Sequence, residues 1–359
     1  MKRFKQILRT LAAATTLLTS PTIAADAPIR WSSGLLKQTP GWFSSPEARA
    51  AAATVLLYQS REGGWPKNHD LLKPPASPEA LAAIQNREGN TIDNGSTTTP
   101  LRFLALVAQG GNGEQYYPAV IKGIDYLLSA QYPNGGYPQF YPLRQSGYYS
   151  RITYNDNAMI SVLDLLRDVA AGQPPFAFVD SARRDRAASA VARGVDCILR
   201  TQIKESGKLT AWCAQHDEKT LTPAWARKYE PPSLSGSESV GIVRFLMAIE
   251  KPSPGIIAAV EGAVTWLKSV EIKGTRRERF KNAGKDDLRI VNDAGAGSLW
   301  ARFYELETHR PIFLGRDSTV HYAISEIEHE RRNGYAYYGN WPASLIENDY
   351  PKWRARHQK

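Results

Sequence analysis

The stretch Gln59-Ser60-Arg61-Glu62-Gly63-Gly64-Trp65-Pro66 returns, 72 residues further on, as Gln131-Tyr132-Pro133-Asn134-Gly135-Gly136-Tyr137-Pro138. The glutamine, the glycine pair, the aromatic residue and the proline keep their places in both copies. A weaker third copy runs from Gln202 to Trp212, 71 residues after the second. Regular spacing of this kind indicates a repeated structural unit, so the fold is predicted to contain several copies of one element.

Helical segments flank every copy of the repeat. Apolar residues at helical spacing precede the copies, at 46–59, 118–131 and 187–202, with 256–270 as a possible fourth segment. A second helical segment follows each copy, at 96–107, 158–170 and 238–249. Glycine ends the first helix because it accepts the left-handed conformation, and the proline beyond it prevents the helix from resuming. Each unit is therefore predicted to be a helix, a loop and a second helix.

Repeated helical hairpins can stack as an open solenoid or close into a ring. Three to four units are enough to close a ring, and neither end of the chain shows a polar capping repeat. We therefore expect an all-α fold, an (α/α) toroid or incomplete α/α barrel built from repeated helical hairpins. The proline-rich stretches are short, so residues 25–359 are expected to form a single domain.

The N-terminal segment has the three parts of a secretory signal peptide. Four cations come first, at Lys2, Arg3, Lys5 and Arg9. An apolar run then covers 7–18, and small residues end at Ala24. We expect 1–24 to be removed on export, with a signal anchor as the alternative, and no later stretch reaches the length of a membrane helix. The mature chain is expected to be an exported monomer, either periplasmic or secreted.

The mature chain remains basic. Removing the four signal cations leaves 41 Lys and Arg against 35 Asp and Glu, which lowers the formal net charge from +10 to +6. A basic surface raises the local concentration of polyanions. For an exported protein the favoured polyanion is an acidic polysaccharide, and the sequence holds no nucleic-acid-binding motif.

The chain holds two cysteines, Cys197 and Cys213. In an oxidising compartment they could form one disulfide. Cys197 lies on the apolar face of a predicted helix, where a buried free thiol is equally compatible with the pattern. Two thiols without a nearby pair of histidines do not make a zinc site.

Two predicted helix starts carry an aspartate beside asparagine, Asp93 with Asn94 and Asp156 between Asn155 and Asn157. Each could serve only as a helix N-cap. Helix starts at one end of a toroid face the same mouth, however, so the two carboxylates and the amide oxygens would converge there. Hard oxygen ligands of this kind suit calcium. The two carboxylates could instead be the acid and the base of an inverting glycoside hydrolase.

Aromatic residues occupy the repeat loops and their surroundings, at Trp65, Tyr137, Tyr141, Tyr148, Tyr149 and Trp212. Their rings could stack on the faces of sugars, or they could fill the core beneath a loop. Of this group, Trp65 is the residue that we expect to contact substrate.

Arginines stand among aromatic residues and glycines in the last third of the chain, at Arg227, Arg302, Arg316 and Arg331. An arginine between aromatic residues is ordinarily stacked or ion-paired, and Arg302 could pair with Glu305. A cluster of arginines that faces two acidic loops has a further use, because a planar guanidinium holds a carboxylate through two hydrogen bonds. A polyuronate offers one carboxylate per sugar.

Seven segments together give the chain a specific resemblance to polysaccharide lyase family 10, the helical pectate lyases. The resemblance extends over most of the mature chain. Its segments are Gly63-Gly64-Trp65-Pro66-Lys67-Asn68, Thr91-Ile92-Asp93-Asn94-Gly95-Ser96-Thr97, Tyr154-Asn155-Asp156-Asn157-Ala158, Trp225-Ala226-Arg227-Lys228-Tyr229-Glu230, Gly315-Arg316-Asp317, Glu330-Arg331-Arg332-Asn333-Gly334-Tyr335 and Asn340-Trp341-Pro342.

This resemblance implies a toroid with an open substrate cleft and calcium-assisted β-elimination of α-1,4-polygalacturonate, which gives 4,5-unsaturated oligogalacturonides. By position in the matched motifs, it implies that Arg316 is the catalytic base. It further implies that Arg302 and Arg331 bind substrate carboxylates and that Arg227 lines the cleft. An arginine with an ordinary pKa of about 12.5 or above acts as a base only under alkaline conditions and beside other cations.

The resemblance also implies that Asp93 and Asp156 hold Ca²⁺, and we add Asn94 to Trp65 as an expected substrate-binding residue. His321 departs from the family pattern, because a lysine is expected at its place. One substrate contact of the family is therefore in doubt in this chain.

Two other functions account for part of the pattern. An inverting hydrolase acting on an acidic polysaccharide shares the fold and the two carboxylates, but it leaves the arginine cluster without a role. A non-catalytic, uronate-binding periplasmic protein explains the basic cleft, but it gives Arg316 no role beyond binding. An unsaturated product would distinguish the lyase from both.

Overall fold

The computed structural model describes residues 29–357, apart from residues 112 and 146. The predicted signal segment, 1–24, lies outside these residues. Among the described residues, none of the helices has the length and apolar character needed to cross a bilayer. Both cysteines are buried and free, so of the two states that the sequence left open, the structure has the buried thiols.

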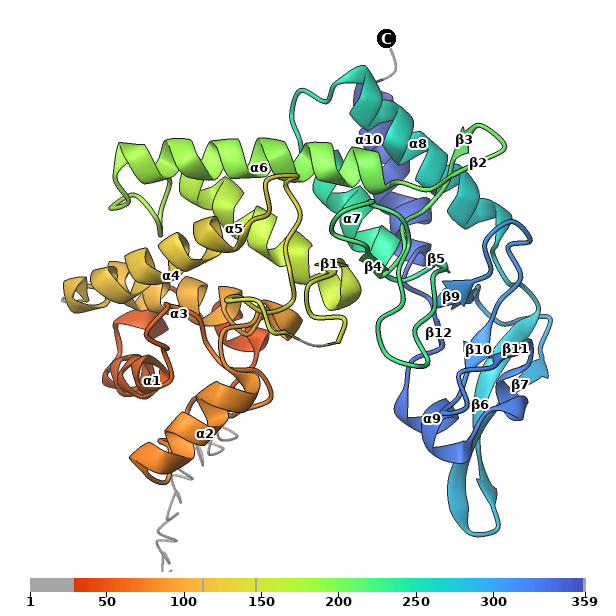
Figure 1. Ribbon diagram of the computed structural model, residues 1–359, viewed down its shortest axis with the longest axis horizontal. Coiled ribbons are helices and arrows are strands. Elements are labelled where there is room, and N and C mark those ends of the chain that lie inside the picture. Colours follow the sequence, from red (N-terminus) through yellow and green to blue (C-terminus); the bar gives the residue numbers. More distant parts are fainter. Residues whose placement is uncertain (1–28, 112, 146, 358–359) are drawn as a thin grey trace, which may run out of the picture.

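Two layers of helices form the body of the fold (Figure 1). The first layer holds α1 (Pro46–Leu57), α4 (Tyr117–Ala130), α6 (Ser181–Thr201) and α8 (Pro254–Ser269), and the second holds α3 (Thr98–Gln109), α5 (Ala158–Ala171) and α7 (Glu238–Met247). Within the layers, α4 contacts α6 and α6 contacts α8, while α3 contacts α5 and α5 contacts α7. Each unit therefore contributes one helix to each layer, as the repeat predicted.

Serine and aspartate caps explain where the first-layer helices begin. The side chains of Ser45, Asp180 and Ser253 accept hydrogen bonds from the backbone N–H three residues further on. Pro46 and Pro254 then occupy the first helical position, where a missing N–H has no cost. These caps keep the repeat loops at the opposite, C-terminal ends of the same helices.

The repeat glutamine connects neighbouring units. Each side-chain amide donates one hydrogen bond to a carbonyl of its own loop and one to a carbonyl of the next first-layer helix or its start. The bonds run from Gln59 to Gly63 (3.1 Å) and Ala119 (2.9 Å), from Gln131 to Gly135 (3.0 Å) and Ala190 (2.8 Å), and from Gln202 to Thr210 (2.8 Å) and Ala259 (2.9 Å). The same three connections fix the displacement from one unit to the next.

The tryptophans of the repeat loops are core residues. The indole N–H of Trp65 donates to Val55 of α1 and that of Trp212 donates to Ile198 of α6, and both side chains are fully buried. A buried indole bonded to the preceding helix cannot stack on a sugar, so the expectation that Trp65 binds substrate is wrong. Trp300 makes the same bond to Leu267 of α8 and marks a fourth unit that sequence comparison missed.

A long hairpin interrupts this fourth unit between α8 and Trp300. It consists of β6 (Thr275–Asn282) and β7 (Lys285–Asn292), which pair antiparallel. At its base, Ile272 and Leu299 exchange two backbone hydrogen bonds of 2.9 and 3.0 Å. The insertion displaces Trp300 from the spacing of the earlier copies, which is why the fourth unit is hard to recognise in the sequence.

The remaining elements are short. The other helices are α2 (Pro78–Glu88), α9 (His329–Gly334) and α10 (Tyr350–His357). Two-residue strands form five antiparallel pairs: β1 (Ile152–Thr153) with β4 (Gln215–His216), β2 (Lys204–Glu205) with β3 (Lys208–Leu209), β5 (Leu234–Ser235) with β9 (Phe303–Tyr304), β8 (Trp300–Ala301) with β12 (Tyr338–Gly339), and β10 (Phe313–Leu314) with β11 (Val320–His321).

The mainly helical class is thus confirmed, but the last third is not all-α. There a second apolar cluster, which includes Tyr229, Phe313 and Tyr337, supports loops and short strands. In Figure 1, α1 and α8 lie at opposite ends of the helical layers, which form an open arc in this view. Closure into a toroid is not established by these contacts.

Replacing Gln202 by alanine should destabilise the fold. The side chain is 5% exposed and holds two carbonyls, one of them in the next unit. We expect a loss of about 1–3 kcal/mol in the free energy of unfolding, the usual cost of leaving buried polar groups without a partner. Urea unfolding followed by circular dichroism measures it, with the exposed Gln109→Ala as the control. Equal stability of the two variants would contradict the role of the repeat glutamine.

Candidate active site

Two tight turns lead into second-layer helices and carry the predicted metal ligands. They are η3 (Asp93–Gly95) before α3 and η5 (Asn155–Asn157) before α5, and the two turns are in contact. Each turn holds two successive residues with positive φ, a conformation that asparagine, aspartate and glycine adopt more readily than other residues. This shared backbone makes Asn94 equivalent to Asp156 and Asp93 equivalent to Asn155.

The expectation that the two aspartates occupy matched places is therefore wrong, because Asp93 and Asp156 stand at different positions of their turns. Asp93 is 5% exposed, whereas Asp156 is exposed. Asn94, the counterpart of Asp156, is also exposed, and both line a polar cavity of about 400 Å³ between α3 and α5. The structure thus brings Asn94 and Asp156 together and sets Asp93 deeper in the fold.

Asp93 is paired with a lysine from the first repeat loop. Lys67 Nζ lies 2.7 Å from Asp93 Oδ2. The other carboxylate oxygen, Oδ1, is buried and has no hydrogen-bond partner among the described residues. An orphaned buried carboxylate oxygen is a suitable ligand for a hard cation.

Asp156 is tied to a buried arginine. Arg302 Nη2 donates to Asp156 Oδ1 at 2.9 Å and to Asn155 Oδ1 at 3.3 Å, and it also pairs with Glu238 at the start of α7. Burial alone would lower the pKa of Arg302, but Glu238, Tyr335 and Asp156 together raise it above its ordinary value. Arg302 therefore remains a cation, and its predicted pairing with Glu305 is replaced by the pairing with Glu238.

Four arginines named from the sequence converge on two tyrosine rings. The guanidinium carbon of Arg331 lies 3.7 Å from the centre of the Tyr229 ring, that of Arg227 lies at 4.9 Å and that of Arg316 at 5.4 Å. Around Tyr335 the corresponding distances are 4.9 Å for Arg331, 5.0 Å for Arg302 and 5.8 Å for Arg227. We call these four residues the arginine cluster.

Arg331 differs from the other members of the cluster because two of its donor nitrogens, Nε and Nη2, are buried without a partner among the described residues. The residue as a whole is 5% exposed. Its nearest carboxylate contact is Nη1 to Glu330 Oε1 at 3.8 Å. A buried cation with unsatisfied donors is costly unless an anion binds to it, so Arg331 indicates an anionic ligand.

Arg227 is held by Glu230, three residues further on. Nε of Arg227 donates to Glu230 Oε2 at 2.8 Å, and the hydroxyl of Tyr335 donates to Oε1 at 2.9 Å. Burial would raise the pKa of Glu230, but Arg227 and Tyr335 outweigh it and the pKa lies below its ordinary value. Glu230 therefore stays ionised and fixes both Arg227 and Tyr335.

Arg316 is the exposed member of the cluster. Its Nη2 donates to Glu330 Oε1 at 2.9 Å, and its backbone N–H donates to Glu328 Oε1 at 2.8 Å. The hydrogen bond to Glu330 raises the pKa of Arg316. As long as this pair persists, Arg316 is a poorer base than a free arginine.

Tyr148 connects the arginine cluster with the turn at Asp93. The pKa of Tyr148 is raised to about 12, mainly by burial, and the charges of Arg227, Glu230 and Asp93 also act on it. The acidic turn and the cluster are therefore within electrostatic range of one tyrosine. Among the aromatic residues named from the sequence, Tyr148 is the one in this position.

The donor set fits a calcium ion that takes further oxygens from its substrate. No group of three or more His, Cys, Asp or Glu side chains in the described part of the chain could hold a metal alone. Asp93 Oδ1 is free, and Asp156 offers a second, exposed carboxylate on the adjoining turn. Because Ca²⁺ takes 6–8 oxygens, carboxylates of a bound ligand and water would complete its coordination.

Sequence reasoning assigned no role to several residues that organise the site. These are Lys67, Tyr229, Glu230, Glu238 and Tyr335. The spacing of Arg227 and Glu230 by three residues could have indicated their pairing. No local pattern connects Glu238 with Arg302, because 64 residues separate them. His321 lies in β11 and contacts Asp317 at 3.1 Å.

Known proteins are similar to this chain in sequence and in fold. A family model described as pectic acid lyase matches residues 59–346. A solved structure of a family 10 polysaccharide lyase from Cellvibrio cellulosa is 38% identical, with a TM-score of 0.74, over 87% of this chain and 95% of that chain.

A second solved structure is an aspartate-to-alanine mutant of a family 10 polysaccharide lyase from the same organism, in complex with trigalacturonic acid. It is 36% identical, with a TM-score of 0.73, over 90% of this chain and 98% of that chain. No curated protein sequence gives a significant match.

Replacing Glu238 by glutamine should destabilise the site. Among the described residues, the change leaves the buried Arg302 with the exposed Asp156 as its one charged partner. We expect a loss of about 3 kcal/mol in the free energy of unfolding, because removing one partner of a buried pair leaves an uncompensated charge. Chemical denaturation measures the loss, and Glu250→Gln at the exposed end of the same segment is the matched control. A variant as stable as this control would refute the pairing.

Proposed function

The chain belongs to the pectic acid lyases of polysaccharide lyase family 10, and we propose that it cleaves α-1,4-polygalacturonate by calcium-assisted β-elimination with Arg316 as the base. It is a pectate lyase, and the finer assignments of substrate, metal and base are the proposal. The observation that supports them most strongly is the buried guanidinium of Arg331, whose Nε and Nη2 have no hydrogen-bond partner among the described residues, inside a cluster of four arginines. Such a cluster suits a substrate that carries one carboxylate per sugar.

The reaction makes separate demands on the site. A base removes the proton at C5, next to the uronate carboxylate. The electron pair of the C5–H bond forms the C4–C5 double bond, the C4–O bond breaks, and the departing oxygen is protonated by solvent. Negative charge develops on the carboxylate during this step, so fixed cations beside it lower the barrier.

Arg331 and Arg302 suit that electrostatic role. Both are almost completely buried, and their positions are fixed by Tyr229 and Tyr335 or by Glu238. Arg331 has free donors, Nε and Nη2, for a carboxylate. Arg302 is hydrogen-bonded to Asp156 and contributes its positive charge without direct contact with the substrate. Arg227 and Asn94 are proposed as further substrate contacts, the first beside Tyr335 and the second at the polar cavity.

Arg316 suits the base because it is the cluster member that solvent and substrate reach. Its neutral form accepts the C5 proton and becomes the ordinary cation. Asp93 and Asp156 are the proposed Ca²⁺ ligands, and the bound ion supplies charge neutralisation at the substrate carboxylate. We further propose that residues 25–359 act as one exported, monomeric domain, in the periplasm or outside the cell.

Ultraviolet absorbance during incubation with polygalacturonate at alkaline pH tests lyase chemistry. We expect the unsaturated chromophore to form with calcium and not with a chelator. Arg316→Ala should lower kcat by about 10²- to 10⁴-fold, the usual contribution of a general base. Arg310→Ala, at an exposed arginine outside the cluster, should retain activity. Reducing ends without the chromophore would mean hydrolysis and would transfer the chemistry to Asp93 and Asp156.

Glu330→Gln tests the base through its pH dependence. Pairing with Glu330 raises the pKa of Arg316, so a higher pH is needed to obtain the neutral base. Removing the carboxylate should lower this pKa and move the rising limb of log(kcat/KM) toward lower pH. The pH profiles of wild type, Glu330→Gln and the control Glu326→Gln measure the shift. An unmoved limb in Glu330→Gln would argue against Arg316 as the titrating group.

A further inference from the structure

The arginines of the β6–β7 hairpin fall into two groups, one paired with carboxylates and one not. Arg276 pairs with Glu278 and Asp293, and Arg289 pairs with Glu278. Arg277 and Arg279 are both exposed, yet neither forms an ion pair with any carboxylate of the described residues. Residues two apart on a strand project from the same face, so the two unpaired guanidinium groups stand side by side.

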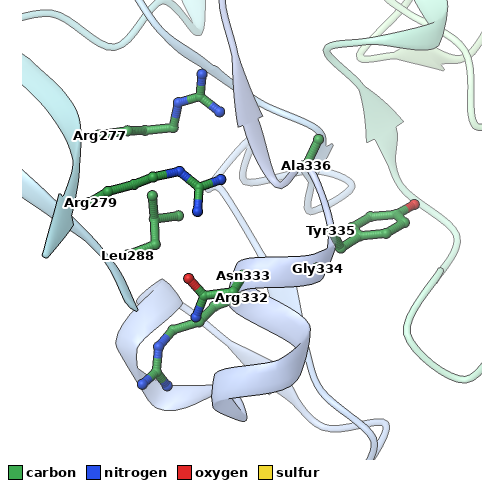
Figure 2. Close-up of a pocket in the computed structure, with 8 residues that line it drawn as sticks. All are labelled: Arg277, Arg279, Leu288, Arg332, Asn333, Gly334, Tyr335 and Ala336. Atoms are coloured by element: carbon green, nitrogen blue, oxygen red, sulfur yellow. The ribbon is translucent and has the colours of Figure 1, made fainter. Parts of the chain in front are cut away.

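These two arginines form one wall of a cavity of about 440 Å³ between the hairpin and the segment that follows α9. The cavity is lined by Arg277, Arg279, Leu288, Arg332, Asn333, Gly334, Tyr335 and Ala336. Figure 2 shows the side chains of Arg277 and Arg279 parallel to one another and directed toward the α9 end of the cavity. Leu288, the strand partner of Arg279, lies beneath them.

The opposite wall is held rigidly against the hairpin. Arg332 of α9 binds Asp287 of β7 through two hydrogen bonds of 2.6 Å, and its guanidinium points away from Arg277 and Arg279 (Figure 2). The pKa of Asp287 lies far below its ordinary value, chiefly because of this pair. Arg332 is therefore committed to structure and does not compete for a ligand.

Asn333 adds a hydrogen-bond acceptor to the cavity. Its Nδ2 donates to Asp287 Oδ1 at 3.0 Å and to the carbonyl of His329 at 2.9 Å, which fixes the amide. Its Oδ1 is buried and has no partner among the described residues. In Figure 2 this oxygen is on the side of Arg279 and Leu288.

Tyr335 joins the cavity to the arginine cluster. The residue lines the cavity, while its ring projects from the other side of the chain segment in Figure 2. That ring lies 4.9–5.8 Å from the guanidinium carbons of Arg331, Arg302 and Arg227. One stretch of backbone thus separates the cavity from the cluster.

We propose that this cavity is an additional subsite that binds the carboxylate and a hydroxyl of one galacturonate unit in a chain that extends from the arginine cluster. Arg277 and Arg279 donate to the carboxylate, and Asn333 Oδ1 accepts from the hydroxyl. The inference rests on the proposed function for the identity of the ligand. The subsite favours long chains, because a short oligomer held at the cluster leaves the cavity unfilled.

Binding measurements in a background of low activity test the subsite. Arg316→Ala provides a protein that turns over its ligand about 10²- to 10⁴-fold more slowly, and calorimetry compares trigalacturonate with polygalacturonate. Adding Arg277→Gln and Arg279→Gln should weaken polygalacturonate binding by at least about tenfold, because the loss of even one charge-assisted hydrogen bond has an effect of that size. Trigalacturonate binding should remain unchanged. With Arg316 intact, the same two substitutions should raise KM for the polymer and leave kcat unchanged.

Arg289→Gln is the matched control, since it removes one positive charge from the other set of hairpin arginines. Arg279→Gln alone is compared with this control, because each variant loses one positive charge. Arg279 is chosen over Arg277 because Arg277 also donates a hydrogen bond to the carbonyl of Tyr338. If Arg289→Gln weakened binding as much as Arg279→Gln, the effect would be net charge and the subsite would be refuted. Equal losses for trimer and polymer, or no loss, would also overturn it.

Failure of the subsite and failure of the proposed function are distinguishable. If wild type forms the unsaturated product and the Arg277 and Arg279 variants bind the polymer normally, the lyase function stands and the subsite is refuted. Wild type that binds polymer through Arg279 without forming that product would support the subsite and refute the proposed chemistry.

Discussion

The side-chain amide of the repeat glutamine is the interaction on which the architecture depends. At Gln59, Gln131 and Gln202 it holds its own loop and the next first-layer helix through two hydrogen bonds. An amide has two N–H donors with fixed geometry, so it fixes both distance and orientation between units. With the units spaced in this way, the turns η3 and η5, which carry Asp93 and Asp156, are in contact.

The sequence predicted the helices well because their signals are local. Apolar periodicity and the glycine pairs place both layers within two residues of their observed bounds, except that α6 begins six residues before its expected start. The fourth unit was recognised only as a helix, since the inserted hairpin separates α8 from Trp300. The short strands of the last third had no local signal, because they are two residues long and several pair with a segment distant in sequence, as Leu234 does with Tyr304. The role given to Trp65 failed because a loop aromatic can face inward.

The candidate site was predictable as a set of residue types but not as a network. The four arginines do gather, yet each has a different state: Arg302 is neutralised by Glu238, Arg227 is fixed by Glu230, Arg316 is paired at the surface, and Arg331 keeps free donors. These states depend on burial and on distant carboxylates, which no motif encodes. They also divide the work, since fully paired arginines preserve the shape of the site while an unpaired one leaves binding energy for a ligand.

The two backbone hydrogen bonds between Ile272 and Leu299 bring the two ends of the hairpin together beside α8, although the hairpin also contacts α9 further along. Closing a loop whose ends already meet adds little entropic cost as the loop lengthens. Changes in the length or charge of 273–298 therefore leave the helical units connected as before. The helical layers can keep their arrangement when the hairpin changes, whereas α9 and its Arg331 depend on the hairpin through the pair between Arg332 and Asp287.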